Sequence, residues 1–209
     1  MKTLFLASYF TCVSDLLLPI LPKKPNELRL AFVPTAADPY ESKSWFYEDK
    51  NKLIAMGFLM KEIDIKNKTK EKLYEELDDV NVLFISGGNT YYLLEKARES
   101  GFDEVVKNLV GKGVIYLGSS AGTALACSTI EYVEDFDDKS ITRLKTYEGL
   151  NFTNKLIMPH YGDERYEVKF QTILDKWRNK GYQMLPLKNS QVLVIQDDKE
   201  EVKEVLIPS

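Results

Sequence analysis

The sequence contains one histidine and two cysteines, and this scarcity limits the chemistry that the chain can perform. Cys12 and Cys127 are widely separated, so they form neither a disulfide framework nor the paired-cysteine spacing of a metal site. A usual zinc site needs several cysteine and histidine ligands. We therefore expect no metal and no disulfide. Cys127 lies in a run of small apolar residues, where we expect a buried thiol.

The sequence also lacks long apolar runs, an excess of positive charge, internal repeats and linker-like segments. No stretch approaches the roughly 20 apolar residues of a membrane span. The apolar run Thr3–Ala7 is too short for a signal peptide, and no small-x-small cleavage site follows it. With 28 basic and 32 acidic residues the net charge is -4, which argues against a nucleic-acid-binding face. We expect a cytoplasmic protein that forms one domain over residues 1–209 and binds neither membranes nor nucleic acids.

Apolar runs alternate with amphipathic helical stretches over more than half of the chain. This alternation is typical of an α/β fold, here an open, mainly parallel sheet with helices on both faces. The expected strands span residues 3–7, 28–34, 58–64, 80–85 and 114–117, with helices at 42–56, 69–77, 91–99 and 102–109. Later strands are expected at 155–158, 183–187, 191–195 and 201–207, with a helix over 163–179. Ligands of such sheets bind beyond the carboxyl ends of the strands.

A glycine-rich turn follows the apolar strand that ends at Leu117. Residues Gly118–Gly122 (Gly-Ser-Ser-Ala-Gly) fit the G-x-S-x-G motif, in which a sharp turn between a strand and a helix exposes the central serine. Such a turn lifts the Ser120 hydroxyl above the sheet edge and aims the first N–H groups of the next helix at the same point, where they can stabilise an oxyanion. The same residues also suit a plain turn where a helix packs closely on a strand.

His160 is the only histidine, and it follows the expected strand 155–158. A serine hydroxyl is a weak nucleophile at neutral pH and needs an adjacent base, which is usually histidine. If a catalytic triad exists, His160 is its base; otherwise His160 is a loop residue that hydrogen-bonds a neighbour. A second glycine turn, Gly87–Asn89, also ends a strand and should lie beside Gly118–Gly122.

Three segments together resemble peptidase E and its relatives, which include aspartyl dipeptidases and cyanophycinases. They are Phe84–Tyr91 (Phe-Ile-Ser-Gly-Gly-Asn-Thr-Tyr), Leu117–Cys127 (Leu-Gly-Ser-Ser-Ala-Gly-Thr-Ala-Leu-Ala-Cys) and Met158–Tyr161 (Met-Pro-His-Tyr). The segments occur in the family's order and at similar spacing, and the likeness extends from the first strand to the closing strands. The resemblance implies a serine peptidase without a cofactor, on an open α/β sheet like that of class I glutamine amidotransferases.

Carried over to this sequence, the resemblance implies that Ser120 is the nucleophile and His160 the general base. Asp135 matches an aspartate assigned as the third member of the triad, which holds the imidazole tautomer and stabilises the imidazolium. Asp135 lies in an acidic stretch, where carboxylates are commonly solvated. Some relatives place the orienting acid in a late turn, and here that turn carries Asn189. An asparagine can orient a histidine but stabilises its charged form less.

The resemblance also implies that the backbone N–H groups of Gly88 and Ala121 form the oxyanion hole. Arg165 resembles an arginine that follows the family's histidine, and Asn89 stands next to Gly88. Both side chains are expected to bind substrate. An arginine fork suits an acidic side chain, and peptidase E releases an N-terminal aspartate from dipeptides. The spacing from the histidine is shorter here, and Arg165 equally suits an exposed position in the first turn of a helix.

We therefore expect a serine peptidase that hydrolyses small peptides, with N-terminal aspartate as a candidate first residue. An esterase using the same serine is one alternative, although an α/β-hydrolase histidine would lie nearer the end of the chain than His160. The other alternative is a non-catalytic descendant that binds a small ligand or partner in the same cleft, and Asn189 in place of an acid favours it. The sequence leaves the oligomeric state open, and a homodimer is one option.

Overall fold

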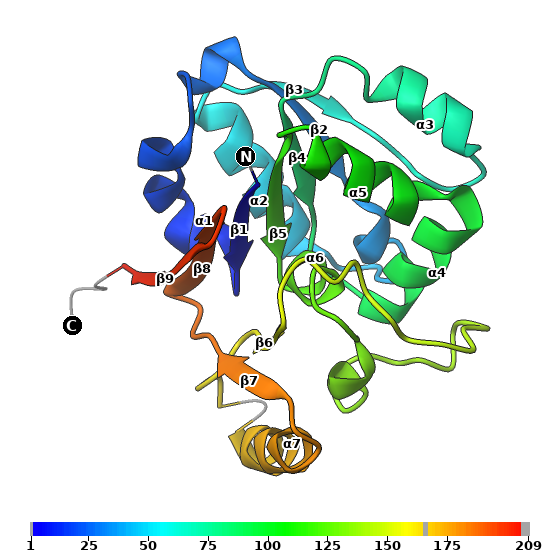
Figure 1. Ribbon diagram of the computed structural model, residues 1–209, viewed down its shortest axis with the longest axis vertical. Helices are drawn as coiled ribbons and strands as arrows, with labels where there is room; N and C mark the ends of the chain where they lie inside the picture. The colour runs from blue at the N-terminus through cyan, green and yellow to red at the C-terminus, as the bar shows by residue number, and fades with distance from the viewer. Residues whose placement is uncertain (1, 165–166, 206–209) are drawn as a thin grey trace.

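The computed structural model describes residues 2–164 and 167–205, which surround a seven-stranded sheet in the order β3-β2-β4-β5-β1-β8-β9 (Figure 1). Neighbours from β3 to β1 run parallel, whereas β8 is antiparallel to both β1 and β9. The expected open, mainly parallel α/β sheet is therefore confirmed. The strands are β1 (Thr3–Ala7), β2 (Arg29–Val33), β3 (Leu59–Glu62), β4 (Val82–Ile85), β5 (Ile115–Ser119), β8 (Gln191–Gln196) and β9 (Lys199–Glu204).

Helices cover both faces of the sheet because alternate residues of its buried strands point to opposite sides. In β1, Leu4 and Leu6 pack into one apolar cluster, whereas Phe5 and Ala7 pack into the other. The first cluster includes residues of α3 (Lys70–Glu76), α4 (Thr90–Ser100), α5 (Phe102–Gly111) and α6 (Ala121–Leu125), and the second includes residues of α1 (Phe10–Val13) and α2 (Ser44–Ala55). Four 3-10 helices complete this part: η1 (Ser14–Ile20), η2 (Pro25–Glu27), η3 (Thr35–Ala37) and η4 (Glu131–Val133).

A second, two-stranded parallel sheet lies outside the main one and carries its own helix (Figure 1). It pairs β6 (Lys155–Met158) with β7 (Gln183–Pro186), and α7 (Glu167–Asn179) connects them. Apolar side chains of this part, including Ile157, Phe170 and Trp177, belong to the same buried cluster as Leu4 and Leu6 of β1. The small sheet therefore shares one continuous apolar cluster with the main sheet, although it lies beyond the ends of the main-sheet strands (Figure 1).

The end of the chain differs from the sequence-based expectation in two respects. The strand expected at 183–187 pairs with β6 and does not join the main sheet. The last strand begins at Lys199, because Asp197 and Asp198 form a two-residue turn that pairs Gln196 with Lys199. Asp197 has a φ of 52°, a left-handed conformation that aspartate tolerates in hairpin turns.

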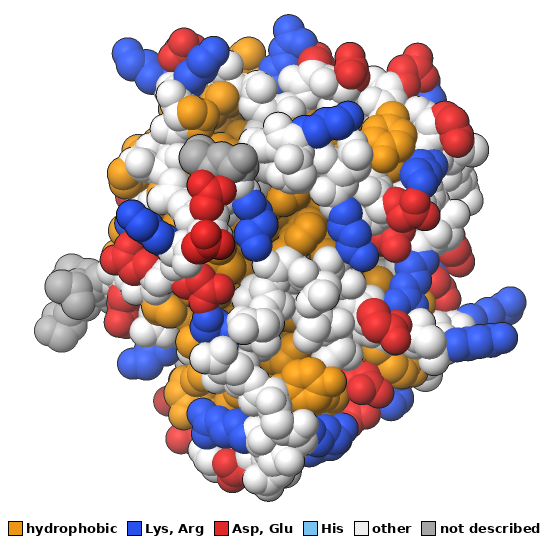
Figure 2. All heavy atoms as spheres, viewed as in Figure 1, with side chains coloured by type: hydrophobic (Ala, Val, Ile, Leu, Met, Phe, Trp, Pro, Cys, Tyr) orange, Lys and Arg blue, Asp and Glu red, His pale blue; other side chains and the backbone are white. Residues whose placement is uncertain are grey.

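The surface mixes charges of both signs. Figure 2 shows acidic and basic side chains interspersed over the face that it presents, with apolar side chains between them. Exposed ion pairs such as Lys72–Glu75 and Lys96–Glu99 link neighbouring turns of helices, where each adds little stability. Within the described ranges, no helix combines the length and the apolar character needed to cross a membrane.

Candidate active site

Ser120 occupies the turn between β5 and α6, with φ 48° and ψ -103°. This conformation is strained for a residue with a side chain, and the flanking glycines make the turn possible. A Cβ on Gly118 would lie 2.7 Å from backbone atoms of Gly122, and one on Gly122 would lie 2.2 Å from the carbonyl oxygen of Ile85. The Ser120 N–H donates to the Ala7 carbonyl at 3.1 Å, which fixes the turn against β1. The strand, turn and helix therefore follow one another as the motif predicts.

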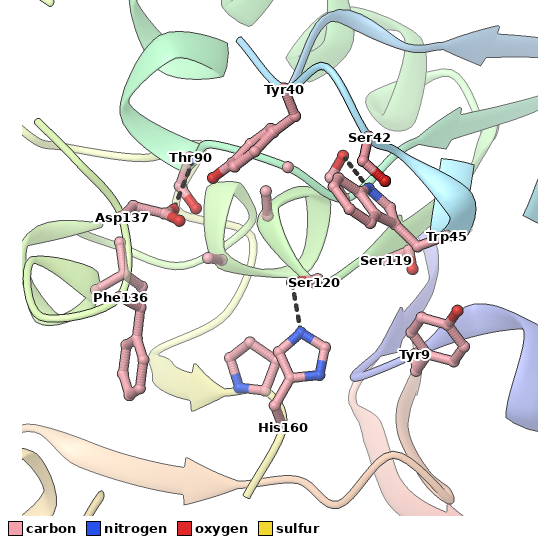
Figure 3. A pocket seen from close by; sticks show the side chains of 16 residues that line it. Tyr9, Tyr40, Ser42, Trp45, Thr90, Ser119, Ser120, Phe136, Asp137 and His160 are labelled. Atoms are coloured by element: carbon pink, nitrogen blue, oxygen red, sulfur yellow. Dashed lines mark hydrogen bonds between the residues drawn. The ribbon is translucent and has the colours of Figure 1, made fainter. Parts of the chain in front are cut away.

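His160 lies in the turn after β6, and its Nε2 is 2.9 Å from the Ser120 Oγ (Figure 3). The φ of His160 is 61°, so its backbone also lies in the left-handed region. The His160 backbone N–H donates to Ser8 Oγ at 2.7 Å, which anchors the turn to the residue that follows β1. The structure thus brings together the serine and the histidine that the sequence analysis selected, from two different sheets.

Asn189 holds the other side of the imidazole, because its Oδ1 is 2.8 Å from His160 Nδ1. Ser8 Oγ accepts the His160 backbone N–H and donates its own hydrogen to Asn189 Oδ1 at 3.0 Å. This arrangement makes the atom facing the ring an acceptor, so Nδ1 carries the hydrogen and Nε2 presents a lone pair to Ser120. Sequence reasoning missed Ser8, although its place directly after β1, at the edge where ligands bind, is a usable signal.

Asp135 is not brought to the imidazole, and the expectation that it orients His160 needs correction. Its side chain is exposed, and its carbonyl oxygen accepts a hydrogen bond from Lys169 Nζ at 2.8 Å. Asn189 reaches Nδ1 because backbone hydrogen bonds join Leu187, just before it, to Met158 and Tyr161 on either side of His160. The pairing of β6 with β7 therefore places the turn that carries Asn189, and not the acidic loop that carries Asp135, beside the His160 ring.

Gly88 and Ala121, the expected oxyanion-hole residues, both line the same cavity as Ser120. Ala121 is the first residue of α6, and within residues 2–164 and 167–205 neither its N–H nor that of Gly88 has a hydrogen-bond acceptor. Gly88 has a φ of 142°, and a Cβ there would lie 2.0 Å from the Ala36 carbonyl oxygen, so only glycine fits. Two unsatisfied donors beside a serine hydroxyl can receive an oxyanion.

The two expected substrate-binding side chains have different outcomes. Asn89 is buried and caps α4, since its Oδ1 accepts from the Tyr92 N–H at 2.9 Å. Its Nδ2 donates to the Asp138 carbonyl at 3.0 Å, so both ends of its amide serve the fold. Arg165 lies outside the described residues, and its part in substrate binding stays a prediction from the resemblance.

A cavity of about 400 Å³ opens in front of the serine and histidine (Figure 3). Its walls are largely aromatic and apolar, with Tyr9 and Trp45 contributed from the α1 and α2 side and Val133 and Phe136 from the loop around η4. The Trp45 Nε1–H donates to the Gly87 carbonyl at 3.4 Å, which supports the glycine turn. A chamber of this size and polarity suits a small organic ligand with few polar groups.

Asp137 also lines this cavity, and the sequence analysis did not select it. Its Oδ2 accepts the Thr90 N–H at 2.8 Å at the start of α4. Burial raises the pKa of this carboxyl to about 6, although the hydrogen bonds from Thr90 favour its ionised form. The sequence pattern of the acidic loop does not distinguish Asp137 from Asp135. Only the folded structure shows that the Asp137 carboxylate faces the cavity.

Cys127 is buried, as the sequence analysis expected. Its Sγ accepts the Ile157 N–H at 3.4 Å, and burial raises the pKa of the thiol to about 11. The thiol therefore stays protonated and links α6 to β6 without acting as a nucleophile. In the part of the chain that the structure describes, no three His, Cys, Asp or Glu side chains cluster in a way that could hold a metal ion.

Comparison with known proteins gives a family match over nearly the whole chain and relatives that match all or part of it. The profile of peptidase family S51 matches residues 4–203. An uncharacterized peptidase of Listeria monocytogenes serovar 1/2a, Lmo0363, is 28% identical over 199 residues, which cover 93% of this chain and 95% of that protein. Peptidase E of Escherichia coli O1:K1 / APEC is 33% identical over 85 residues, or 41% of this chain and 36% of that protein.

Two crystal structures share the fold. A protein from Listeria monocytogenes EGD-e, described as a candidate peptidase E, superposes with a TM-score of 0.91 at 26% identity and covers 99% of this chain and 100% of its own. A peptidase from an acI-B1 Actinobacterium gives a TM-score of 0.70 at 16% identity over 98% of this chain and 88% of its own. The family profile covers all but a few residues at each end, so the chain belongs to peptidase family S51, the peptidase E-like family of serine-type peptidases.

Proposed function

We propose that the protein hydrolyses small peptides through an acyl-enzyme on Ser120, with His160 as general base and Asn189 as the group that orients the ring. The observation that carries this proposal is the 2.9 Å separation of Ser120 Oγ and His160 Nε2 on the wall of the cavity. With the hydrogen on Nδ1 held by Asn189, the lone pair of Nε2 can accept the serine proton.

The reaction would proceed in two halves. Ser120 Oγ attacks the peptide carbonyl carbon while its proton passes to His160 Nε2, and the N–H groups of Gly88 and Ala121 hold the oxyanion that forms. The C–N bond then breaks, and Nε2 returns the proton to the leaving amine. Water then attacks the ester carbonyl while His160 Nε2 accepts its proton; the C–Oγ bond breaks, and Nε2 passes that proton to Ser120 Oγ, which releases the carboxylic acid and regenerates the serine hydroxyl.

The substrate class follows from the size of the cavity and from the family. About 400 Å³ accommodates one or two residues of a peptide and not a folded protein segment. The resemblance to peptidase E implies dipeptides as substrates, with N-terminal aspartate as the preferred first residue. A cytoplasmic location and a homodimer stay predictions from the sequence.

A fluorophosphonate probe tests the nucleophile directly. Ser120→Ala should abolish labelling and peptide hydrolysis together. Ser42→Ala, which changes another serine at the rim of the same cavity, should leave both intact. A dipeptide screen that varies the first residue would then define the substrate, and a matching series of esters would separate peptidase from esterase activity. Wild-type protein that shows no Ser120-dependent labelling would instead support the non-catalytic binding protein.

A further inference from the structure

One ionisable group of the cavity takes no part in the proposed acyl transfer. Asp137 is the only carboxylate among the described residues that line the cavity, and none of the others is lysine or arginine. It comes from the loop after η4, whereas Ser120 comes from the turn between β5 and α6 and His160 from the turn after β6. Figure 3 shows it together with Tyr40 and Phe136 on one side of the cavity, with Ser120 and His160 more central.

Among the described residues, the Asp137 carboxylate has no ionic partner. Its hydrogen bonds come from Thr90, whose N–H donates to Oδ2 at 2.8 Å, and no lysine or arginine of residues 2–164 and 167–205 contributes to its electrostatics. Its raised pKa of about 6 still leaves it mainly ionised at neutral pH. A partly buried anion among apolar groups is unfavourable unless a cation neutralises it. The natural complement is a positive charge on whatever enters the cavity.

A structural role at the start of α4 accounts for only part of this arrangement. A carboxylate that receives the N–H of the first helical residue is stabilised there by the helix dipole. That role needs neither ionisation nor a place on the wall of a reactive chamber. Because Val133, Phe136 and Ala124 surround the cavity, an ammonium group beside Asp137 would gain more there than in water.

We infer that Asp137 is the specificity-determining residue that binds an ammonium group of the substrate while its carbonyl group lies at Ser120. This inference rests on the proposed peptidase function. The ammonium is either the free N-terminus of the peptide or the side chain of a lysine next to the scissile bond. Acetylation of that amine should remove most of the substrate's affinity. A substrate that directs an acidic side chain at Asp137 should bind poorly, because the two negative charges repel each other.

Turnover of three matched p-nitroanilides tests the inference and separates the two sources. They are leucine p-nitroanilide, its N-acetyl derivative and N-acetyl-lysine p-nitroanilide. If the N-terminus is bound, wild type should prefer the free form over the acetylated leucine form by about 100-fold in kcat/KM, the scale of a lost buried charge pair. If a lysine side chain is bound, the acetylated lysine form should instead exceed the acetylated leucine form.

Asp137→Asn is the decisive variant, because asparagine keeps an acceptor for the Thr90 N–H and removes only the charge. The preference between amine-bearing and blocked substrates should shrink to a few-fold. Asp138→Asn, which changes the exposed neighbour, should leave the preference unchanged. A purely structural role would lower the rates for all three substrates equally, so an unchanged preference in Asp137→Asn overturns the inference.

Binding measurements keep this test independent of catalysis. Calorimetry on Ser120→Ala should show that leucinamide or N-acetyl-lysinamide binds at least ten times more tightly than N-acetyl-leucinamide. The added Asp137→Asn change should remove that difference. Equal binding of all three ligands to Ser120→Ala would refute the ammonium site. Failure of the peptidase proposal would appear separately, as wild-type protein without fluorophosphonate labelling.

Discussion

At the scale of single residues, the side chain that orients the imidazole, which is an acid in the usual serine triad, is here the neutral amide of Asn189. Asn189 Oδ1 accepts from Nδ1 and from Ser8 Oγ, so it fixes the ring and its tautomer. It cannot neutralise the positive charge that His160 acquires when it takes the serine proton, which is the second task of the acid in a serine triad. The imidazole is therefore held in the orientation that catalysis needs, but no negative charge at Asn189 stabilises its protonated form.

Replacing Asn189 by aspartate should raise the rate. Aspartate has nearly the same shape, and both its neighbours, His160 Nδ1 and Ser8 Oγ, can donate to a carboxylate. We expect Asn189→Asp to increase the rate of Ser120 labelling by about 10-fold and to move the acid limb of the pH profile to higher pH, because the charged imidazole is stabilised. Asn189→Ala should lower the rate instead. A slower Asn189→Asp variant that remains folded would show that the neutral partner is required.

Another buried carboxylate, Asp49 of α2, should make the stability of the protein depend on pH. Its Oδ1 accepts from Thr11 Oγ1 at 2.7 Å, while Oδ2 is buried and has no hydrogen-bond partner among the described residues. Burial raises its pKa to about 6, above the unfolded value of about 3.9. Between these values the folded state binds more protons, so the contribution of Asp49 to stability falls as the pH rises from about 4 to about 6.

Asp49→Asn should therefore stabilise the protein at pH 7.5 and not at pH 4. The two-unit shift sets an upper limit of about 3 kcal/mol, and we expect a gain of about 1–2 kcal/mol in the free energy of unfolding. Urea denaturation of variant and wild type across this range measures the difference. Exposed Asp78, changed to asparagine as a control, should give a difference that does not vary with pH. A difference for Asp49→Asn that is equally flat would contradict the proposed cause.

At the scale of secondary structure, the site depends on how closely its helices approach the strands. The α6 backbone lies against β4 at Gly122, where a Cβ would be 2.2 Å from the Ile85 carbonyl oxygen. The turn after β4 lies as closely against η3 at Gly88. These two contacts set the positions of both N–H groups of the expected oxyanion hole, so packing and catalysis share the same glycines.

Gly122→Ala should accordingly damage both stability and reactivity. The added methyl group must displace α6 from β4, and overpacking of this kind costs about 1–3 kcal/mol. We expect the free energy of unfolding to fall by that amount in urea titrations, with slower fluorophosphonate labelling of the folded protein. Gly111→Ala in α5 is the matched control, because nothing lies within 4 Å of its added Cβ. That change should be neutral or stabilise the helix by up to about 1 kcal/mol.

The sequence predicts these elements well because their signals are local. The apolar run of β5 and the glycines around Ser120 mark a strand, a turn and a helix within a few residues of each other. The partners of His160 are not local, because Ser8 and Asn189 lie far from it along the chain. The choice of Asn189 over Asp135 follows from strand pairing between β6 and β7, which no residue pattern encodes by itself.

At the scale of the whole molecule, the site lies where two sheets meet. The main sheet supplies Ser120 and the glycine turns, whereas the turn after β6 supplies His160 and the turn after β7 supplies Asn189. Two hydrogen bonds at Ile157 tie β6 to the segment after α6: the Tyr132 hydroxyl donates to the Ile157 carbonyl, and the Ile157 N–H donates to Cys127 Sγ. The sequence pattern marks β6 and β7 as strands but does not show that they form a separate sheet, because sheet membership is decided by tertiary packing.

A site divided between two sheets works only if both parts fold together, and the two tryptophans report on each part. Trp45 lies on α2 at the cavity, and Trp177 lies on α7, buried in the cluster that also contains Leu4 of β1. Because that cluster is continuous, we expect a single cooperative transition, as for one domain over residues 1–209. Trp177→Phe leaves Trp45 as the fluorescent tryptophan, and Trp45→Phe leaves Trp177. In each variant the urea unfolding transition followed by fluorescence should coincide with the transition followed by far-UV circular dichroism. Loss of the Trp177 signal before the main transition would mean that the part carrying His160 unfolds on its own, and labelling of Ser120 should then be lost at the same lower urea concentration.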